Sequence, residues 1–255
     1  MIEGHLSEKH ENHGLRQLLA EIEQKFHTKY TVRRRMERKI NYQKILDDLL
    51  AGLETSECRP SLLLHACCGP CSSYVLEYLS KYFQITVLYY NPNIYPQEEY
   101  ERRLAELKKL YQHFPPAQER SVKVVECEYQ QEQFYEAIGV RDNPELAREP
   151  EKGERCRRCY KFRLEKAAAY AAQNQFDYFC TTLSISPFKD AVKINELGVE
   201  LEGQLLADTG LTAKSPKWLF SDFKKKGGFK RSLELSEEYG MYRQTYCGCI
   251  YSMKT

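Results

Sequence analysis

The chain has 255 residues, of which 42% are hydrophobic and 29% are charged, a balance that suits one large folded domain, with or without appended segments. The net charge of +2 is too small to indicate nucleic-acid binding by itself. No apolar run reaches the roughly 20 residues of a membrane span, and the polar N-terminus lacks the apolar stretch of a signal peptide. We therefore expect a cytoplasmic protein without membrane contact.

The first fifty or so residues predict a helical extension. Apolar residues recur at helical spacing between Leu15 and Phe26, and again between Tyr42 and Leu53. The basic run KYTVRRRMERK, residues 29–39, lies between them; it either meets nucleic-acid phosphates or is a solvated face. We place a boundary near TSECRP, so that residues 1–58 form a basic helical extension and residues 59–255 the main domain.

The main domain is predicted to alternate strands with helices. Strand-length segments that are apolar or rich in β-branched and aromatic residues occur at residues 61–66, 85–93, 122–129 and 176–185. Helices are predicted from Gly69-Pro70, from Pro96, through Phe134 and Ile138, and from Cys156. This order predicts an α/β fold with a mostly parallel, Rossmann-like sheet flanked by helices.

Ligands of such sheets bind outside the carboxyl ends of the strands. That rule places Cys67, Cys68 and Cys71 at the mouth of the first strand. Asn91 would follow the second strand, and residues 184–187 the fourth. We expect the functional edge of the domain there.

Ten cysteines are many for a cytoplasmic protein, where clustered thiols indicate metal or redox chemistry more often than structural disulfides. Three stand alone, at Cys58, Cys127 and Cys180, and are best read as small buried hydrophobes. The other seven form three groups: Cys67, Cys68 and Cys71; Cys156 and Cys159; Cys247 and Cys249.

The first group lies in HACCGPCSS, residues 65–73, which contains the thioredoxin-type tetrapeptide CGPC. Thiol exchange there would leave the second pair, in CRRC from residue 156, without a role. The adjacent Cys67 and Cys68, together with Cys156 and Cys159, offer four thiolates from two helix N-termini, which suits zinc or an iron–sulfur cluster. Arg157, Arg158 and Lys161 would add positive field. Because the ligands lie at the functional edge, a cluster is favoured over a structural zinc.

The last pair, in YCGCIYS, is of another kind. Two cysteines separated by one glycine can close a small, strained disulfide of the labile sort that serves catalysis. The alternative is that Cys247 or Cys249 is a further metal ligand.

Four motifs in this order, HACCGPCSS, ERCRRCYKFRLEKAA, TTLSISPFKD and RQTYCGCIYS, resemble the QueH family of epoxyqueuosine reductases over about residues 61–252. The resemblance implies an oxidoreductase for the last step of tRNA queuosine biosynthesis. Such an enzyme reduces the epoxide of epoxyqueuosine, at the tRNA wobble position, without cobalamin.

The resemblance also implies site residues. The ligands of a [4Fe-4S] cluster would be Cys67, Cys68, Cys156 and Cys159, and Cys247 with Cys249 would be a redox-active pair. For Cys71, three roles stay open: a ligand to a second iron or other metal beside the cluster, a thiol in exchange, or a spectator. The partners would be tRNA and an unidentified electron donor.

Proton donors for the epoxide oxygen are suggested only by their proximity to the motifs: Asp190 above all, with His65, Tyr160 and Tyr246. Aromatic residues near the second strand end are candidates to stack the target base: Tyr89, Tyr90 and Tyr95. The basic run Lys224–Arg231 and the one at residues 29–39 gain weight as contacts to the tRNA backbone.

Two rival functions stay open. A cluster-containing, ATP-using tRNA thiolase would need a glycine-rich phosphate loop, where this chain has CCGPCSS. A zinc-stabilised RNA-binding protein without catalysis would contain zinc and no iron.

Overall fold

The computed structural model describes residues 40–55, 58–209 and 214–253. The chain divides into two compact units between Arg59 and Pro60. In the first unit, α2 (Tyr42–Leu53) starts after Asn41, whose side chain accepts a hydrogen bond from the backbone N–H of Lys44. The helix expected there is confirmed.

The apolar face of α2 is buried at Leu46, Leu50 and Leu53, as its helical periodicity predicts. The apolar face expected between Leu15 and Phe26 and the basic run at residues 29–39 lie outside the described residues.

The second unit is built on a sheet whose five described strands are all parallel. In spatial order these are β3 (Lys123–Glu126), β2 (Gln84–Tyr89), β1 (Ser61–His65), β4 (Tyr178–Thr181) and β5 (Lys217–Trp218). The strands read as continuous apolar runs because the inner ones are covered on both faces. Leu62, Leu63 and Leu64 of β1 are fully buried. The predicted parallel, Rossmann-like sheet is confirmed.

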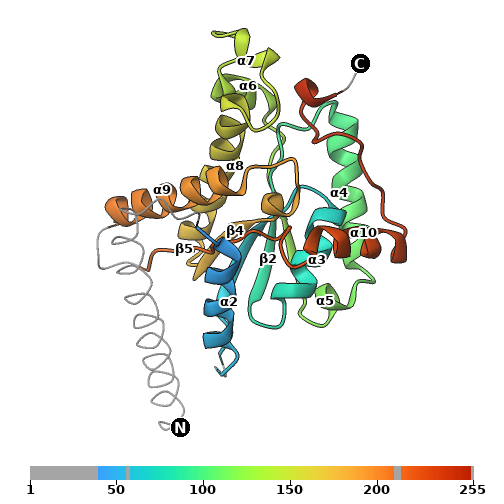
Figure 1. The fold of residues 1–255 in the computed structure, drawn as a ribbon, viewed down its shortest axis with the longest axis vertical. Helices are drawn as coiled ribbons and strands as arrows, with labels where there is room; N and C mark the ends of the chain where they lie inside the picture. Colours follow the sequence, from blue (N-terminus) through green and yellow to red (C-terminus); the bar gives the residue numbers. More distant parts are fainter. Residues whose placement is uncertain (1–39, 56–57, 210–213, 254–255) are drawn as a thin grey trace. The chain divides into compact units, whose positions relative to one another are not determined.

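Helices cover the sheet in two groups, and Figure 1 shows them on either side of the strands. The first consists of α3 (Gly69–Leu79), α4 (Gln97–Tyr111), α5 (Pro115–Gln118) and α10 (Gly228–Glu238). The second consists of α6 (Gln131–Ile138), α7 (Glu145–Arg148), α8 (Glu154–Gln173) and α9 (Ala191–Thr209). Within the second group α8 packs on β1 and β4, so it carries its side chains to the middle of the sheet.

The strand order reverses at β1. The chain leaves β1 for β2 and β3 on one side and returns to β4 and β5 on the other, and His65 pairs in register with Thr181 at the ends of the two central strands. Ligand sites of open parallel sheets form at such a switch point. The residues that follow His65 and Thr181 therefore frame the expected site.

The fourth strand is shorter than predicted. Residues 176–185 were expected as one strand, but β4 ends at Thr181 and a 3-10 helix, η1 (Thr182–Ile185), follows. The Thr181 hydroxyl oxygen accepts a hydrogen bond from the backbone N–H of Leu183, which turns the chain out of the sheet. This turn brings Leu183 and Ile185 over the switch point.

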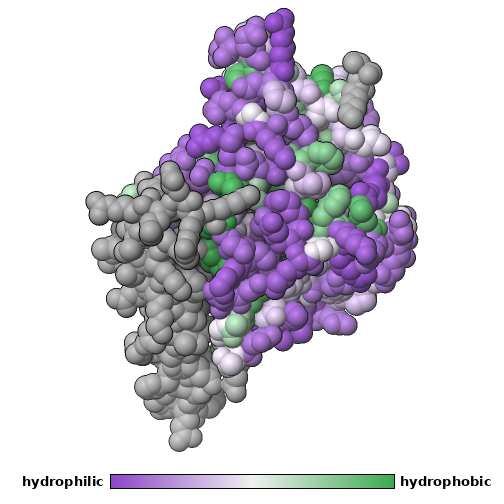
Figure 2. All heavy atoms as spheres, viewed as in Figure 1, coloured by the Kyte–Doolittle hydropathy of each residue, from purple (hydrophilic) through white to green (hydrophobic). Residues whose placement is uncertain are grey.

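No helix within the described ranges is long and apolar enough to cross a membrane. Among the described residues on the face drawn in Figure 2, hydrophilic side chains predominate and hydrophobic ones form small, separate areas.

Candidate active site

A cavity of about 290 Å³ lies at the switch point. All three cysteine groups of the sequence contribute to its wall: Cys67, Cys71, Cys156, Cys159, Cys247 and Cys249. Tertiary folding thus brings together thiols that are up to about 180 residues apart in the chain, at the sheet edge where the sequence predicts a site.

The first group is a tight cluster of thiols between β1 and α3. The sulfurs of Cys67, Cys68 and Cys71 all lie within 4.8 Å of one another, and those of Cys67 and Cys68 are 3.7 Å apart. Cys68 is buried and does not line the cavity; its sulfur accepts a hydrogen bond from the Gln244 amide at 3.1 Å. Geometry therefore adds Cys71 to the adjacent pair.

The thiols of this cluster ionise unequally. Hydrogen bonds from Cys68 and Cys71 to the Cys67 sulfur, helped by the positive Arg163, hold the pKa of Cys67 well below its usual value. The same hydrogen bonding to Cys67 raises the pKa of Cys68 to about 12 and raises that of Cys71. Cys67 is thus the first of the three to become a thiolate, and metal binding would release the remaining protons.

The second group lies on one face of α8. Cys156, Cys159, Tyr160 and Arg163 follow one another at helical spacing, and all four line the cavity. The cations expected to supply positive field are instead paired outside it: Lys161 with Glu200 at 2.7 Å, Arg157 with Glu200 at 4.0 Å, and Arg158 with Glu154 at 3.2 Å. None of the three lines the cavity.

Arg163 supplies positive charge beside the thiols instead. Its side chain is buried, with Nε donating to the Cys159 carbonyl at 3.3 Å and Nη1 to the Asn91 side chain at 3.4 Å. Within the described part of the chain no carboxylate forms an ion pair with it. Burial lowers the pKa of Arg163, but the thiols of Cys159 and Cys67 raise it more, so the guanidinium stays charged beside them.

A second buried cation, Lys189, faces the same cavity. Its Nζ lies 3.7 Å from Glu151. Burial lowers its pKa, but attraction to Cys247 and Tyr160 outweighs burial, so the ammonium remains charged. Sequence reasoning did not single out Arg163 or Lys189; the signal for Arg163 was its place one helical turn beyond Cys159.

The third group is held by backbone contacts. Gly248 has φ +108°, and a Cβ there would lie 2.8 Å from Ile94 Cγ1 and 2.9 Å from Arg103 Nη1, so only glycine fits between the two cysteines. Its carbonyl accepts a hydrogen bond from the Tyr95 N–H at 2.8 Å. Cys247 Sγ lies 3.0 Å from the hydroxyl of Ser252, the last residue of the 3-10 helix η2 (Ile250–Ser252).

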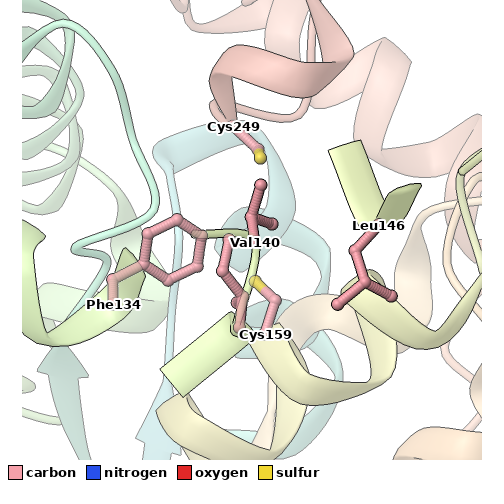
Figure 3. Packing of buried hydrophobic residues seen from close by; sticks show 6 residues of the cluster. Phe134, Val140, Leu146, Cys159 and Cys249 are labelled. Carbon is pink, nitrogen blue, oxygen red and sulfur yellow. The ribbon is translucent and has the colours of Figure 1, made fainter. Parts of the chain in front are cut away.

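Arg103 of α4 fixes the same segment. Its guanidinium donates to the carbonyls of Cys247 and Tyr246 at 3.2 and 3.3 Å, and its Nε pairs with Glu99 at 2.6 Å. Figure 3 shows Cys249 entering an apolar cluster from this segment, and Cys159 entering it from α8. Burial among these apolar side chains raises the pKa of Cys249.

The expected proton donors fall in different places. Asp190 is outside the cavity lining, and its carboxylate accepts hydrogen bonds from the backbone N–H groups of Val192 and Lys193 at the start of α9. His65 is buried, with its Nε2–H donating to the Tyr90 carbonyl at 3.0 Å; burial lowers its pKa to about 4. Tyr160 and Tyr246 do line the cavity.

The Tyr160 hydroxyl is buried and has no hydrogen-bond partner within the described ranges. It is therefore free to donate to a ligand. The three tyrosines expected to stack a base differ in exposure: Tyr89 and Tyr90 are buried, and of the three only Tyr95 is exposed, at 38%. Burial excludes a stacking role for Tyr89 and Tyr90.

Residues 62–255 match the family model described as epoxyqueuosine reductase QueH. The chain belongs to the QueH family. An epoxyqueuosine reductase QueH of Streptococcus pyogenes serotype M1 is 40% identical over 216 residues, which cover 85% of this chain and 79% of the relative. QueH of Staphylococcus epidermidis is 39% identical over 84% of this chain and 85% of the relative, and that of Thermotoga maritima 34% identical over 76% and 90%.

The QueH match begins at Leu62, so it covers the second unit and leaves out α2 and the residues before it. All three cysteine groups, together with Arg103, Arg163 and Lys189, fall within it.

The donor set of this QueH site fits a metal centre. Thiolates select zinc, copper(I) and iron–sulfur clusters. A single tetrahedral ion with metal–sulfur bonds of about 2.3 Å needs sulfurs roughly 3.8 Å apart, a spacing that Cys67 and Cys68 already have. Six thiols around one cavity exceed the four that one such ion takes.

Proposed function

We propose that this protein reduces epoxyqueuosine in tRNA to queuosine. The observation that carries the proposal is the meeting of three cysteine groups at one cavity, beside the buried cations Arg155, Arg163 and Lys189, in a chain of the QueH family. Residues 59–255 would be the reductase domain and residues 1–58 a basic extension. Since tRNA is the substrate, the enzyme would work in the cytoplasm.

The proposed resident cofactor is a [4Fe-4S] cluster held by Cys67, Cys68, Cys156 and Cys159. The soft donor set, the excess of thiols over the needs of one ion and the buried positive charge of Arg163 support it. When bound, such a cluster supplies electrons one at a time and a Lewis-acidic iron. Cys71, within 4.8 Å of two of these sulfurs, is proposed as a ligand to a second metal there.

Cys247 and Cys249 are proposed as the dithiol that completes the reaction. Removing the epoxide oxygen breaks two C–O bonds, forms a C=C bond and consumes two electrons and two protons, so the oxygen leaves as water. Oxidation of two thiols to one disulfide releases two electrons and two protons, which balances the step. An external electron donor must then return the disulfide to the dithiol.

The cavity offers its own groups for the departing oxygen. The Lys189 ammonium would stabilise negative charge that develops there, and the free Tyr160 hydroxyl would donate a hydrogen bond or a proton. Asp190 remains the candidate from the sequence. An Asp190→Asn variant separates these roles, because asparagine can still cap α9 but cannot supply a proton.

The basic run Lys224–Arg231 supports a tRNA substrate. It runs into the start of α10, where Phe229 and Ser232 line the cavity, and Lys225 and Lys230 are exposed. Clustered exposed cations attract a nucleic-acid backbone irrespective of its sequence. The run is therefore proposed to hold the tRNA while one nucleotide reaches the thiols.

The test is conversion of the modified nucleoside. Protein reconstituted anaerobically with iron and sulfide, and given a strong reductant, should convert epoxyqueuosine in tRNA to queuosine, measured by mass spectrometry of the digested tRNA. Absence of conversion with a fully loaded cluster would refute the function. Zinc without iron after anaerobic purification would favour a non-catalytic RNA-binding protein, and ATP-dependent sulfur insertion a thiolase.

A further inference from the structure

Phe188 lies at the mouth of the thiol cavity. Its side chain is 62% exposed, more than any other large hydrophobic residue in the described part of the chain. It also lines the cavity. An aromatic ring stabilises a fold through the area that it buries, so the exposed part of the Phe188 ring contributes nothing to the stability of this fold.

The position of Phe188 is set by a tight turn between η1 and α9. Its backbone N–H donates to the Ser186 hydroxyl at 3.2 Å, and the Lys189 N–H donates to the Ser186 carbonyl at 3.2 Å. Pro187 restricts the turn further. The ring is thus presented to solvent by a constrained segment whose next residue, Lys189, already points into the cavity.

A cation shares the same mouth. Arg243, from the segment after α10, is exposed and lines the cavity, and within the described ranges it forms no ion pair. The run Lys224–Arg231 lies near this mouth, because Phe229 of the run lines the cavity, and the run adds the exposed Lys225. An exposed aromatic face together with unpaired positive charge is the combination that binds single-stranded nucleic acid.

The geometry points to a nucleotide clamp. Phe188 stacks on a base of the single-stranded loop next to the nucleotide that enters the cavity, and Arg243 pairs with a phosphate of that loop. The clamp rests on the proposed function, which makes an RNA loop the substrate. It also replaces Tyr89 and Tyr90, which are buried, as the stacking surface.

The experiment measures RNA binding without catalysis. A fluorescein-labelled, unmodified anticodon stem–loop is titrated with reconstituted protein, and anisotropy reports the Kd. Loss of one base–aromatic stack costs about 1–3 kcal/mol, so Phe188→Ala should raise the Kd about 5- to 140-fold. Phe188→Trp should bind as tightly as wild type, and Phe188→Leu should fall between them because it keeps apolar area but not stacking.

Arg243 is tested through salt. Arg243→Gln should raise the Kd and reduce the slope of log Kd against log salt by about one, whereas Arg243→Lys should keep the slope. Val199→Ala, which shortens an exposed residue of α9 outside the cavity lining, is the matched control and should bind as wild type.

Equal affinities for Phe188→Ala, Val199→Ala and wild type would overturn the clamp. The clamp would also be overturned if Phe188→Ala raised the Kd for the loop and the Kd for a plain RNA duplex by the same factor, since paired bases cannot stack on the ring. These outcomes are independent of turnover. If the wild type converts epoxyqueuosine and Phe188→Ala binds the loop with the wild-type Kd, the clamp alone fails. If the Kd depends on Phe188 but the wild type converts no epoxyqueuosine, the proposed function fails.

Discussion

Arg103 offers the sharpest test of how the segment with Cys247 and Cys249 is held. Its side chain is 1% exposed, and it joins Glu99, whose side chain is 11% exposed, to the carbonyls of Tyr246 and Cys247. Arg103→Met keeps most of the apolar stem but removes these hydrogen bonds and leaves the Glu99 carboxylate without its cation. Removing one partner of a buried ion pair costs about 3–5 kcal/mol.

The assay is urea unfolding followed by circular dichroism on the metal-free protein. We expect the free energy of unfolding to fall by about 3–5 kcal/mol in Arg103→Met. The matched control is Arg120→Met, because Arg120, two residues after α5, is exposed; its free energy of unfolding should fall by less than about 0.5 kcal/mol. A fall of under about 1 kcal/mol for Arg103→Met would refute the reasoning.

A double variant separates the two causes. Adding Glu99→Gln to Arg103→Met removes the unpaired buried charge while a side-chain oxygen remains for the Tyr242 hydroxyl, which donates to Glu99 at 3.0 Å. The double variant should therefore be more stable than Arg103→Met alone. If the two variants are equally stable, the unpaired Glu99 charge costs nothing, and the lost hydrogen bonds to the carbonyls account for the loss in Arg103→Met. Faster alkylation of Cys247 in Arg103→Met would show that the segment has loosened.

Three further outcomes are expected. Replacing Cys247 and Cys249 together by alanine should leave the iron content unchanged and abolish turnover; loss of iron would show them to be ligands. Arg163→Gln should lower the reduction potential of the reconstituted protein by on the order of 60 mV, and Arg163→Lys should restore most of it, in titrations followed by electron paramagnetic resonance; an unchanged potential would contradict the role of the buried charge. Burial raises the pKa of Asp177, but Lys214 and Ser61 lower it more, so its folded pKa lies below the unfolded value and its stabilisation is lost as the pH falls below about 4. Asp177→Asn should cost about 1.5–3 kcal/mol at pH 7 and flatten the acid dependence of unfolding; an equal slope in both proteins would show another group to be responsible.

Sequence reasoning succeeded where local pattern decides structure. The apolar run at Leu62–Leu64 and the Gly69-Pro70 turn after it predict β1 and α3, and the structure has both. It failed at Thr181, where one side-chain hydrogen bond ends β4. It left α9, β5 and α10 unassigned, because their burial depends on partners elsewhere in the chain.

The sequence by itself determined the parallel sheet, the three groups of cysteines, and the place of Cys67, Cys68 and Cys71 at the carboxyl end of the first strand. These follow from periodicity and spacing, which act over a few residues. Only the tertiary structure decided that Cys71 joins Cys67 and Cys68, that Arg163 and Lys189 rather than Arg157 and Lys161 face the thiols, and that Phe188 is exposed while Tyr89 is buried. The physical reason is that burial of a charge or a ring depends on segments far apart in the chain, and no local pattern records which of them will pack together.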